Sequence, residues 1–178
     1  MKRQRLVLSC LCLLGIGWTP AQAQVAPRSL LSFVQEFYDW YLPLTSVQRV
    51  GPTWYELLTR RSEILTPQLR RALQADSAAQ VGAPGESVGL DFDPFLFSQD
   101  PCERYEVGGA TRKGTRYWVD VYEVCAGKRS AHPHVVAEVA PSRGGWVFVN
   151  LHYGRSNLLR ILDDLKRQRA RHQSNSTH

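Results

Sequence analysis

The chain has 178 residues, of which 43% are hydrophobic and 21% are charged, and its formal net charge is +6. The positive charge is concentrated at the two ends. Residues 1–23 carry a net +3 and the segment from Arg155 onward a net +4, which leaves about −1 for residues 24–154. Without a basic face in its central part, the chain lacks the electrostatic footprint of a nucleic-acid-binding protein.

The first 23 residues have the pattern of a secretory signal peptide. A basic start, MKRQR, precedes an apolar run of 13 residues and the small-x-small sequence Ala21-Gln22-Ala23. The apolar run is shorter than the roughly 20 residues that a membrane-spanning helix needs. We expect cleavage near Ala23 and a periplasmic or secreted protein of about 155 residues with no transmembrane span.

Helical periodicity comes first in the mature chain. Residues 28–42 predict an amphipathic helix, which Pro43 is expected to end. Residues 53–65 predict a second helix, and Thr66-Pro67 predicts the N-cap and first position of a third. The small, Gly- and Pro-containing segment 75–87 predicts a loop. The apolar face of the first helix consists of Leu30, Phe33, Val34, Phe37 and Tyr41.

The period then changes to two, as expected for strands. Short turns between the alternating segments favour antiparallel pairing. The predicted strands are residues 115–124, 134–140 and 145–153, with a weaker one at 104–109, and the predicted turns are 111–115 and 141–145.

A closing helix is predicted over residues 157–168, with Ser156 as its cap, and the polar residues 169–178 are expected to be a disordered tail. The order of helices, strands and one last helix indicates an α+β protein. We expect one domain, residues 24–168, in which the N-terminal helices pack on a curved antiparallel sheet.

Two cysteines remain after cleavage, Cys102 and Cys125. An even pair in an exported chain predicts a disulfide bond. Such a crosslink contributes roughly 3 kcal/mol in the chain-entropy description. A zinc site built on the two cysteines lacks partners at zinc-ligand spacing in the neighbouring sequence, so no metal or other cofactor is expected.

The segment LDFDPFLFSQDP, residues 90–101, is the most distinctive stretch. Asp91 and Asp93 have the first-and-third spacing of a calcium loop, but the glycine and glutamate required later in such a loop are absent. We interpret the stretch as a structural closure beside a pocket, in which Pro94 stiffens a turn and the aspartates accept hydrogen bonds from backbone N–H groups. A looser calcium site, in which Asp100 returns to the other two aspartates, is the alternative.

Four segments resemble a domain-of-unknown-function (DUF) family of small exported bacterial proteins with a nuclear transport factor 2-like, or cystatin-like, fold. They are FVQEFYDWYL, LTPQLRRAL, LDFDPFLFSQD, and the strand GWVFVNLHY before a leucine-rich helix. The resemblance covers about residues 30–165 and implies a helix-backed, strongly curved sheet that forms a cone with a pocket. It implies no activity and carries over no catalytic residue. It singles out Asp91, Asp93, Gln99 and Asp100 as candidate binding residues.

Our preferred functional hypothesis is an exported, non-enzymatic binding or interaction domain for an unknown small ligand or protein partner. The first alternative is an acid–base enzyme of the isomerase or dehydratase kind, since a carboxylate in an apolar cone can have a raised pKa. Its candidate groups are Asp91, Asp93, Asp120 and His152. His134 and His152 would form a zinc-like pair if their strands brought them together. The third hypothesis is an immunity-type protein that blocks a toxin.

Overall fold

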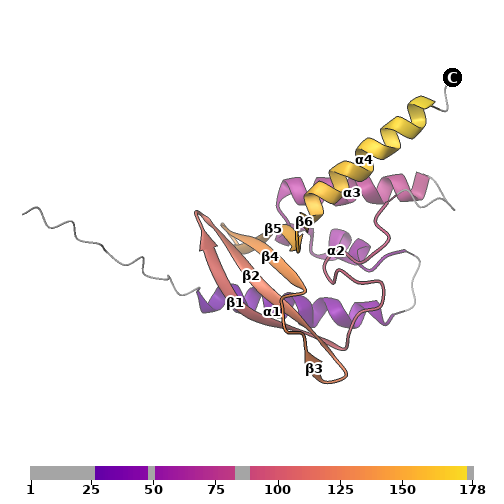
Figure 1. The fold of residues 1–178 in the computed structure, drawn as a ribbon. Helices are drawn as coiled ribbons and strands as arrows, with labels where there is room; N and C mark the ends of the chain where they lie inside the picture. The colour runs from indigo at the N-terminus through magenta and orange to yellow at the C-terminus, as the bar shows by residue number, and fades with distance from the viewer. Residues whose placement is uncertain (1–26, 48–50, 83–88, 176–178) are drawn as a thin grey trace, which may run out of the picture.

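The structure is a computed structural model and describes residues 27–47, 51–82 and 89–175. The expected signal peptide, residues 1–23, lies outside the described residues. The elements in chain order (Figure 1) are α1 (Arg28–Thr45), α2 (Trp54–Arg60), the 3₁₀ helix η1 (Ser62–Ile64), α3 (Pro67–Gly82), β1 (Arg104–Lys113), β2 (Arg116–Cys125), β3 (Lys128–Arg129), β4 (Val135–Ser142), β5 (Gly145–Tyr153), β6 (Ser156–Asn157) and α4 (Leu158–Asn175).

The strands form one antiparallel sheet that does not close into a barrel. Its order is β1-β2-β4-β5-β6, and the short β3 pairs with β2. Lys113 pairs with Arg116 and Ser142 with Gly145, so β1–β2 and β4–β5 are hairpins with two-residue connections. Both connections fall within the turns predicted from the sequence. Four helices and an antiparallel sheet among the described residues confirm the α+β class.

Helix α1 lies along one face of the sheet (Figure 1). The Phe37 ring is 4.8 Å from the ring of Phe148 on β5 and 5.2 Å from that of Phe95 in the loop before β1. Each large apolar side chain buried in this way contributes roughly 1.5–3 kcal/mol. Because side chains alternate along a strand, the neighbours of the core residues in β2, β4 and β5 point to the opposite, outer face. The buried face of α1 consists of Leu30, Val34, Phe37, Tyr38 and Tyr41.

Two helices run further than the sequence predicted. Pro43 does not end α1, which continues to Thr45. Because Pro43 lies close to the end of the helix, its missing N–H removes only one backbone hydrogen bond there. Helix α3 extends through Gly82, although residues 75–87 were expected to form a loop. The extra turns are anchored by buried Asp76, which accepts hydrogen bonds from the Gln80 side chain and, across to the next segment, from the backbone N–H of Leu90.

The C-terminal segment is also more ordered than predicted. Helix α4 packs against α3 and continues to Asn175, its C-terminal end diverging from α3 in the view of Figure 1, so the expectation of a disordered tail from residue 169 is wrong for residues 169–175. One long-range ion pair ties this helix to α3. Arg169 Nη1 lies 2.8 Å from Oδ1 of Asp76, whose side chain is fully buried. A polar helix end therefore supplies the counter-charge for a carboxylate on α3.

Cys102 and Cys125 form a disulfide, as predicted, with their Cα atoms 4.9 Å apart. The bond joins the end of β2 to the segment that enters β1, so it fixes the point where the distinctive 90–101 loop meets the sheet. Within the described part of the chain, no helix combines the length and the apolar character required to cross a membrane.

The Asp76–Arg169 pair gives the first prediction. Arg169→Gln leaves the buried carboxylate with only the Gln80 amide and the Leu90 N–H, so we expect the free energy of unfolding to fall by about 3 kcal/mol in urea denaturation. Arg171→Gln, at an exposed position two residues along α4, is the matched control and should change it by less than about 0.5 kcal/mol. Equal effects of the two substitutions would contradict a specific role for the pair.

Candidate functional site

The loop of residues 90–101 is anchored in the core by its middle residues. Phe95 and Leu96 have no exposed surface, and Pro94 is buried beside them. The Phe95 ring lies 5.4 Å from that of Tyr41 on α1. The two ends of the turn are joined by a hydrogen bond from the Asp93 N–H to the Ser98 carbonyl, 2.9 Å long. This part of the loop is therefore a packed structural element.

Tyrosine hydroxyl groups satisfy the buried carbonyls of this turn. The three donors come from α1, β1 and β5, so the loop is held by both the helix and the sheet. Burial raises the pKa of all three hydroxyls, which keeps them protonated as donors. The pairs are Tyr153 with the Pro94 carbonyl, Tyr38 with the Phe95 carbonyl at 3.0 Å, and Tyr105 with the Leu96 carbonyl at 3.4 Å.

Asp93 completes this arrangement. Its Oδ1 accepts hydrogen bonds from the backbone N–H groups of Phe95 (2.9 Å) and Leu96 (3.2 Å), and its Oδ2 accepts one from the Tyr41 hydroxyl (2.7 Å). The expected backbone donors are therefore present at Asp93. Burial raises the pKa of the carboxyl group from 3.8 to about 6, although the hydrogen bonds from Tyr41 and the two N–H groups oppose the shift. The side chain is ionised at neutral pH but titrates close to it.

A pocket of about 450 Å³ opens beside Asp93. Its walls come from the end of α1, the segment before α2 and the 90–101 loop, and Asp91, Asp93 and Gln99 all line it. Three hydroxyl side chains, Thr45, Thr53 and Ser98, line it as well. Asp100, the fourth residue singled out in this loop, instead lines a neighbouring pocket of about 370 Å³ together with Cys102 and Glu103. The loop thus divides the four candidate residues between two adjoining pockets.

The three aspartates of the loop do not form a shared cation site. Among the described residues, Cys102, Glu123 and Cys125 are the one group of three or more His, Cys, Asp or Glu side chains whose ligand atoms all lie within 4.8 Å of one another. Asp91 and Asp100 are exposed. Both Asp93 oxygens are already bonded to protein donors, so the loop as folded does not offer the clustered oxygen ligands that calcium requires.

His152 lies on the outer face of the sheet, away from this pocket. Its ring stacks on Trp118 at 4.2 Å, and its Nε2 lies 3.0 Å from Oε2 of buried Glu138. Burial raises the pKa of Glu138, but the hydrogen bonds and charges of Arg116 and His152 outweigh this effect, so the pKa is lowered. The Lys113 ammonium sits 3.3 Å from the centroid of the Trp118 ring. The result is a paired, polar cluster across β1, β2, β4 and β5.

Asp120 also faces outward, because it alternates with core residues Val119 and Val121 on β2. Burial raises the pKa of its carboxyl group. His134 does not meet His152. Its Nε2 lies 3.2 Å from the Phe97 carbonyl, beside the 90–101 loop. The proposed zinc-like histidine pair is therefore wrong, and Asp120 and His152 belong to a different surface from the Asp93 pocket.

The sequence reasoning missed several residues that shape these sites. Tyr105, Tyr153 and Glu138 were not among the candidate residues, because their hydrogen-bond partners are distant in the chain. Phe97 is a further case. It has a left-handed φ of 47°, unusual for a residue with a side chain, and its ring stacks on Tyr153 at 4.3 Å. The stretch 90–101 contains no tyrosine, so the sequence near the turn carries no signal for these contacts.

Comparison of the chain with protein-family models, curated proteins and solved structures finds no match in any of the three. The geometry of the loop, the pocket and the outer sheet face therefore carries the functional argument.

The raised pKa of Asp93 gives the second prediction. The folded protein holds this proton more tightly than the unfolded chain, so the contribution of Asp93 to stability is full below about pH 4 and is lost as the pH rises through about 6. The shift corresponds to about 3 kcal/mol at most. Asp93→Asn keeps an acceptor for the Phe95 and Leu96 N–H groups but removes the titration, so its stability relative to the wild-type protein should increase over this pH range.

The measurement is chemical denaturation of both proteins at several pH values in that range. Asp91→Asn, which changes an exposed carboxylate in the same loop, should follow the wild-type protein throughout. Tyr41→Phe removes a hydrogen bond to the ionised form and should raise the pKa of Asp93 further. An Asp93→Asn curve parallel to the wild-type curve would show that the carboxyl group does not titrate there.

Proposed function

We propose that this protein is an exported, non-enzymatic binding domain whose ligand occupies the pocket beside Asp93. The observation that carries the proposal is the pocket itself. It has a volume of about 450 Å³, which is in the usual range for small-ligand sites, and its walls combine apolar surface with convergent polar groups. One of its lining residues, Asp93, is held in place by hydrogen bonds from Tyr41 and from two backbone N–H groups, so this part of the wall gains little order when a ligand binds.

The lining indicates a cationic, hydrogen-bond-donating ligand group. The exposed Asp91 carboxylate and the exposed Gln99 amide line the pocket beside the hydrogen-bonded Asp93, and none of its described lining residues is Lys, Arg or His. An ammonium or guanidinium group would find acceptors here and no competing positive charge. The same chemistry is available from a small amine or from a basic side chain of a protein partner.

The acid–base alternative draws support from one observation. A carboxyl group with a pKa of about 6 that lines a pocket is a suitable general base near neutral pH. Against this, Oδ1 of Asp93 accepts two backbone N–H groups and Oδ2 accepts the Tyr41 hydroxyl, so the carboxylate is bonded as a structural acceptor. Binding is therefore the function that the geometry supports best.

Export and fold family belong to the same proposal. The Cys102–Cys125 disulfide supports an oxidising compartment, in agreement with the secretory pattern of residues 1–23. The antiparallel sheet backed by α1 supports the nuclear transport factor 2-like classification that the sequence resemblance implied.

Thermal denaturation with a panel of cations tests this function. The panel contains calcium, a primary diamine and an arginine methyl ester, each at increasing concentration. A ligand that binds the folded state raises stability by the mass-action term, roughly 2.7 kcal/mol at a hundred times its dissociation constant. We expect stabilisation by at least one of the organic cations, with calcium less effective because the three aspartates are not clustered.

Asp91→Asn combined with Gln99→Ala should remove this stabilisation. Asp100→Asn is the matched control, because it neutralises a carboxylate of the same loop that lines the neighbouring pocket, and should leave the effect intact. The proposal fails if no organic cation stabilises the wild-type protein, or if all variants respond equally. A calcium effect larger than the others, and lost with Asp91→Asn, would identify the loop as a metal site.

A further inference from the structure

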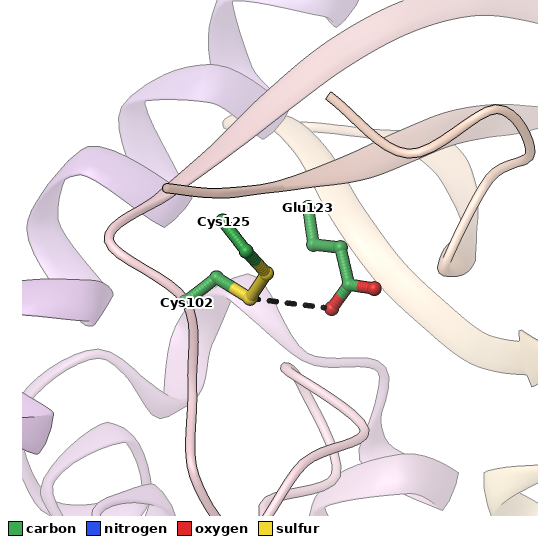
Figure 2. A group of neighbouring side chains, drawn as sticks. All are labelled: Cys102, Glu123 and Cys125. Atoms are coloured by element: carbon green, nitrogen blue, oxygen red, sulfur yellow. Dashed lines mark hydrogen bonds between the residues drawn. A yellow bond between two sulfur atoms is a disulfide. The ribbon is translucent and has the colours of Figure 1, made fainter. Parts of the chain in front are cut away.

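The disulfide lies beside the carboxylate of Glu123, and the other oxygen of this carboxylate contacts the imidazole of His134. Cys102 precedes β1 and Cys125 ends β2, while Glu123 lies two residues earlier on β2. Figure 2 shows the Glu123 carboxylate directed at the sulfur of Cys102, with Oε2 3.6 Å from Sγ. The ligand atoms of Cys102, Glu123 and Cys125 lie within 4.8 Å of one another. The other carboxylate oxygen, Oε1, lies 3.4 Å from Nδ1 of His134.

The hydrogen-bond geometry around Glu123 involves His134 and the disulfide. The Phe97 carbonyl 3.2 Å from His134 Nε2 can only accept a hydrogen bond, so Nε2 carries a proton. In the neutral ring, Nδ1 then presents a lone pair to the carboxylate. The disulfide sulfur on the other side of Glu123 has no hydrogen to donate. The two contacts of the carboxylate are thus with a ring nitrogen and a sulfur, groups that can also bind a metal ion.

These are the ligand types of a zinc site. Zinc prefers tetrahedral sets of thiolate, imidazole and carboxylate groups. Metal-bound histidines usually donate their second N–H to a backbone carbonyl or a carboxylate, and the His134–Phe97 contact has this form. The sequence offered no partner for the cysteines at zinc spacing, but the fold brings Glu123 next to their sulfurs and His134 next to Glu123.

We propose that the reduced protein binds one soft divalent metal ion, of the zinc class, through Cys102, Cys125, Glu123 and His134. A dithiol reductant supplies two electrons and two protons. The disulfide becomes two thiols, and the reductant becomes a disulfide. Metal binding then displaces both thiol protons and forms two metal–thiolate bonds. A disulfide oxidant that accepts two electrons from the thiolates restores the Cys102–Cys125 bond, becomes a dithiol by taking up two protons, and so releases the ion; the same residues then alternate between a crosslink and a metal site.

Cobalt(II) is the probe for this site, because thiolate coordination gives it a charge-transfer absorption band. The folded protein, reduced with a phosphine, should bind one cobalt ion per chain with this band, and zinc should displace it. The oxidised protein should show no band. Far-ultraviolet circular dichroism of the cobalt complex should match that of the oxidised protein, which shows that the ion is held by the folded chain. A metal complex without that signal would overturn the proposal.

Substitutions then separate a folded site from simple chelation by two thiols. Glu123→Gln and His134→Gln should each weaken cobalt binding by about tenfold or more. His132→Gln, at an exposed position two residues from His134, is the matched control and should bind as the unmodified chain does. If both substitutions leave the affinity unchanged, the two cysteines act alone and the four-ligand site is wrong. Absence of the charge-transfer band in the reduced, folded protein would also refute it.

Discussion

The hydrogen bonds from four buried tyrosines to the 93–96 turn are the constraint on which the rest of the structure depends. The turn places three backbone carbonyls and a carboxylate inside the protein, where each unsatisfied group would cost about 1–3 kcal/mol. The donors come from α1, β1 and β5, so the turn can be satisfied only when helix and sheet are already in their final relation. The native conformation of this loop therefore requires that the helix and the sheet of the core are already packed together. The four donors are Tyr38, Tyr41, Tyr105 and Tyr153.

The two proposed sites lie on either side of this fixed turn. The pocket beside Asp93 uses the carboxylates and amide of the loop, whereas the cysteine cluster lies where the loop enters β1. Pro101 borders both pockets and directly precedes Cys102, so the crosslink holds the outer end of the pocket wall. Phe97, on the far side of the turn, stacks on Tyr153, and its carbonyl fixes the His134 ring. One short segment thus positions residues of both the pocket beside Asp93 and the proposed metal site at the two cysteines.

Local patterns in the sequence were sufficient for part of this picture. Period-two alternation predicted the strands and both hairpin turns, because it reflects burial of one face. The spacing of Asp93 and Pro94 predicted the backbone cap, because both partners lie within three residues. The pairs that join distant segments were not predictable in this way. Nothing near Asp76 indicates that its counter-charge is Arg169, and nothing near Cys125 indicates that His134 will lie beside Glu123. The errors at Pro43 and in residues 75–82 have a related origin, since local helix-breaking tendencies were outweighed by tertiary packing.

The pairing of Asp76 with Arg169 has a consequence for the order in which the chain can mature. A polypeptide emerges from the ribosome, or from an export channel, with its N-terminus first. Helix α3 is therefore available long before the last turns of α4. Until those turns arrive, the Asp76 carboxylate lacks its cation, and burying it would be unfavourable. The docking of α3 against α4 is thus postponed until Arg169 has been synthesised and can reach Asp76.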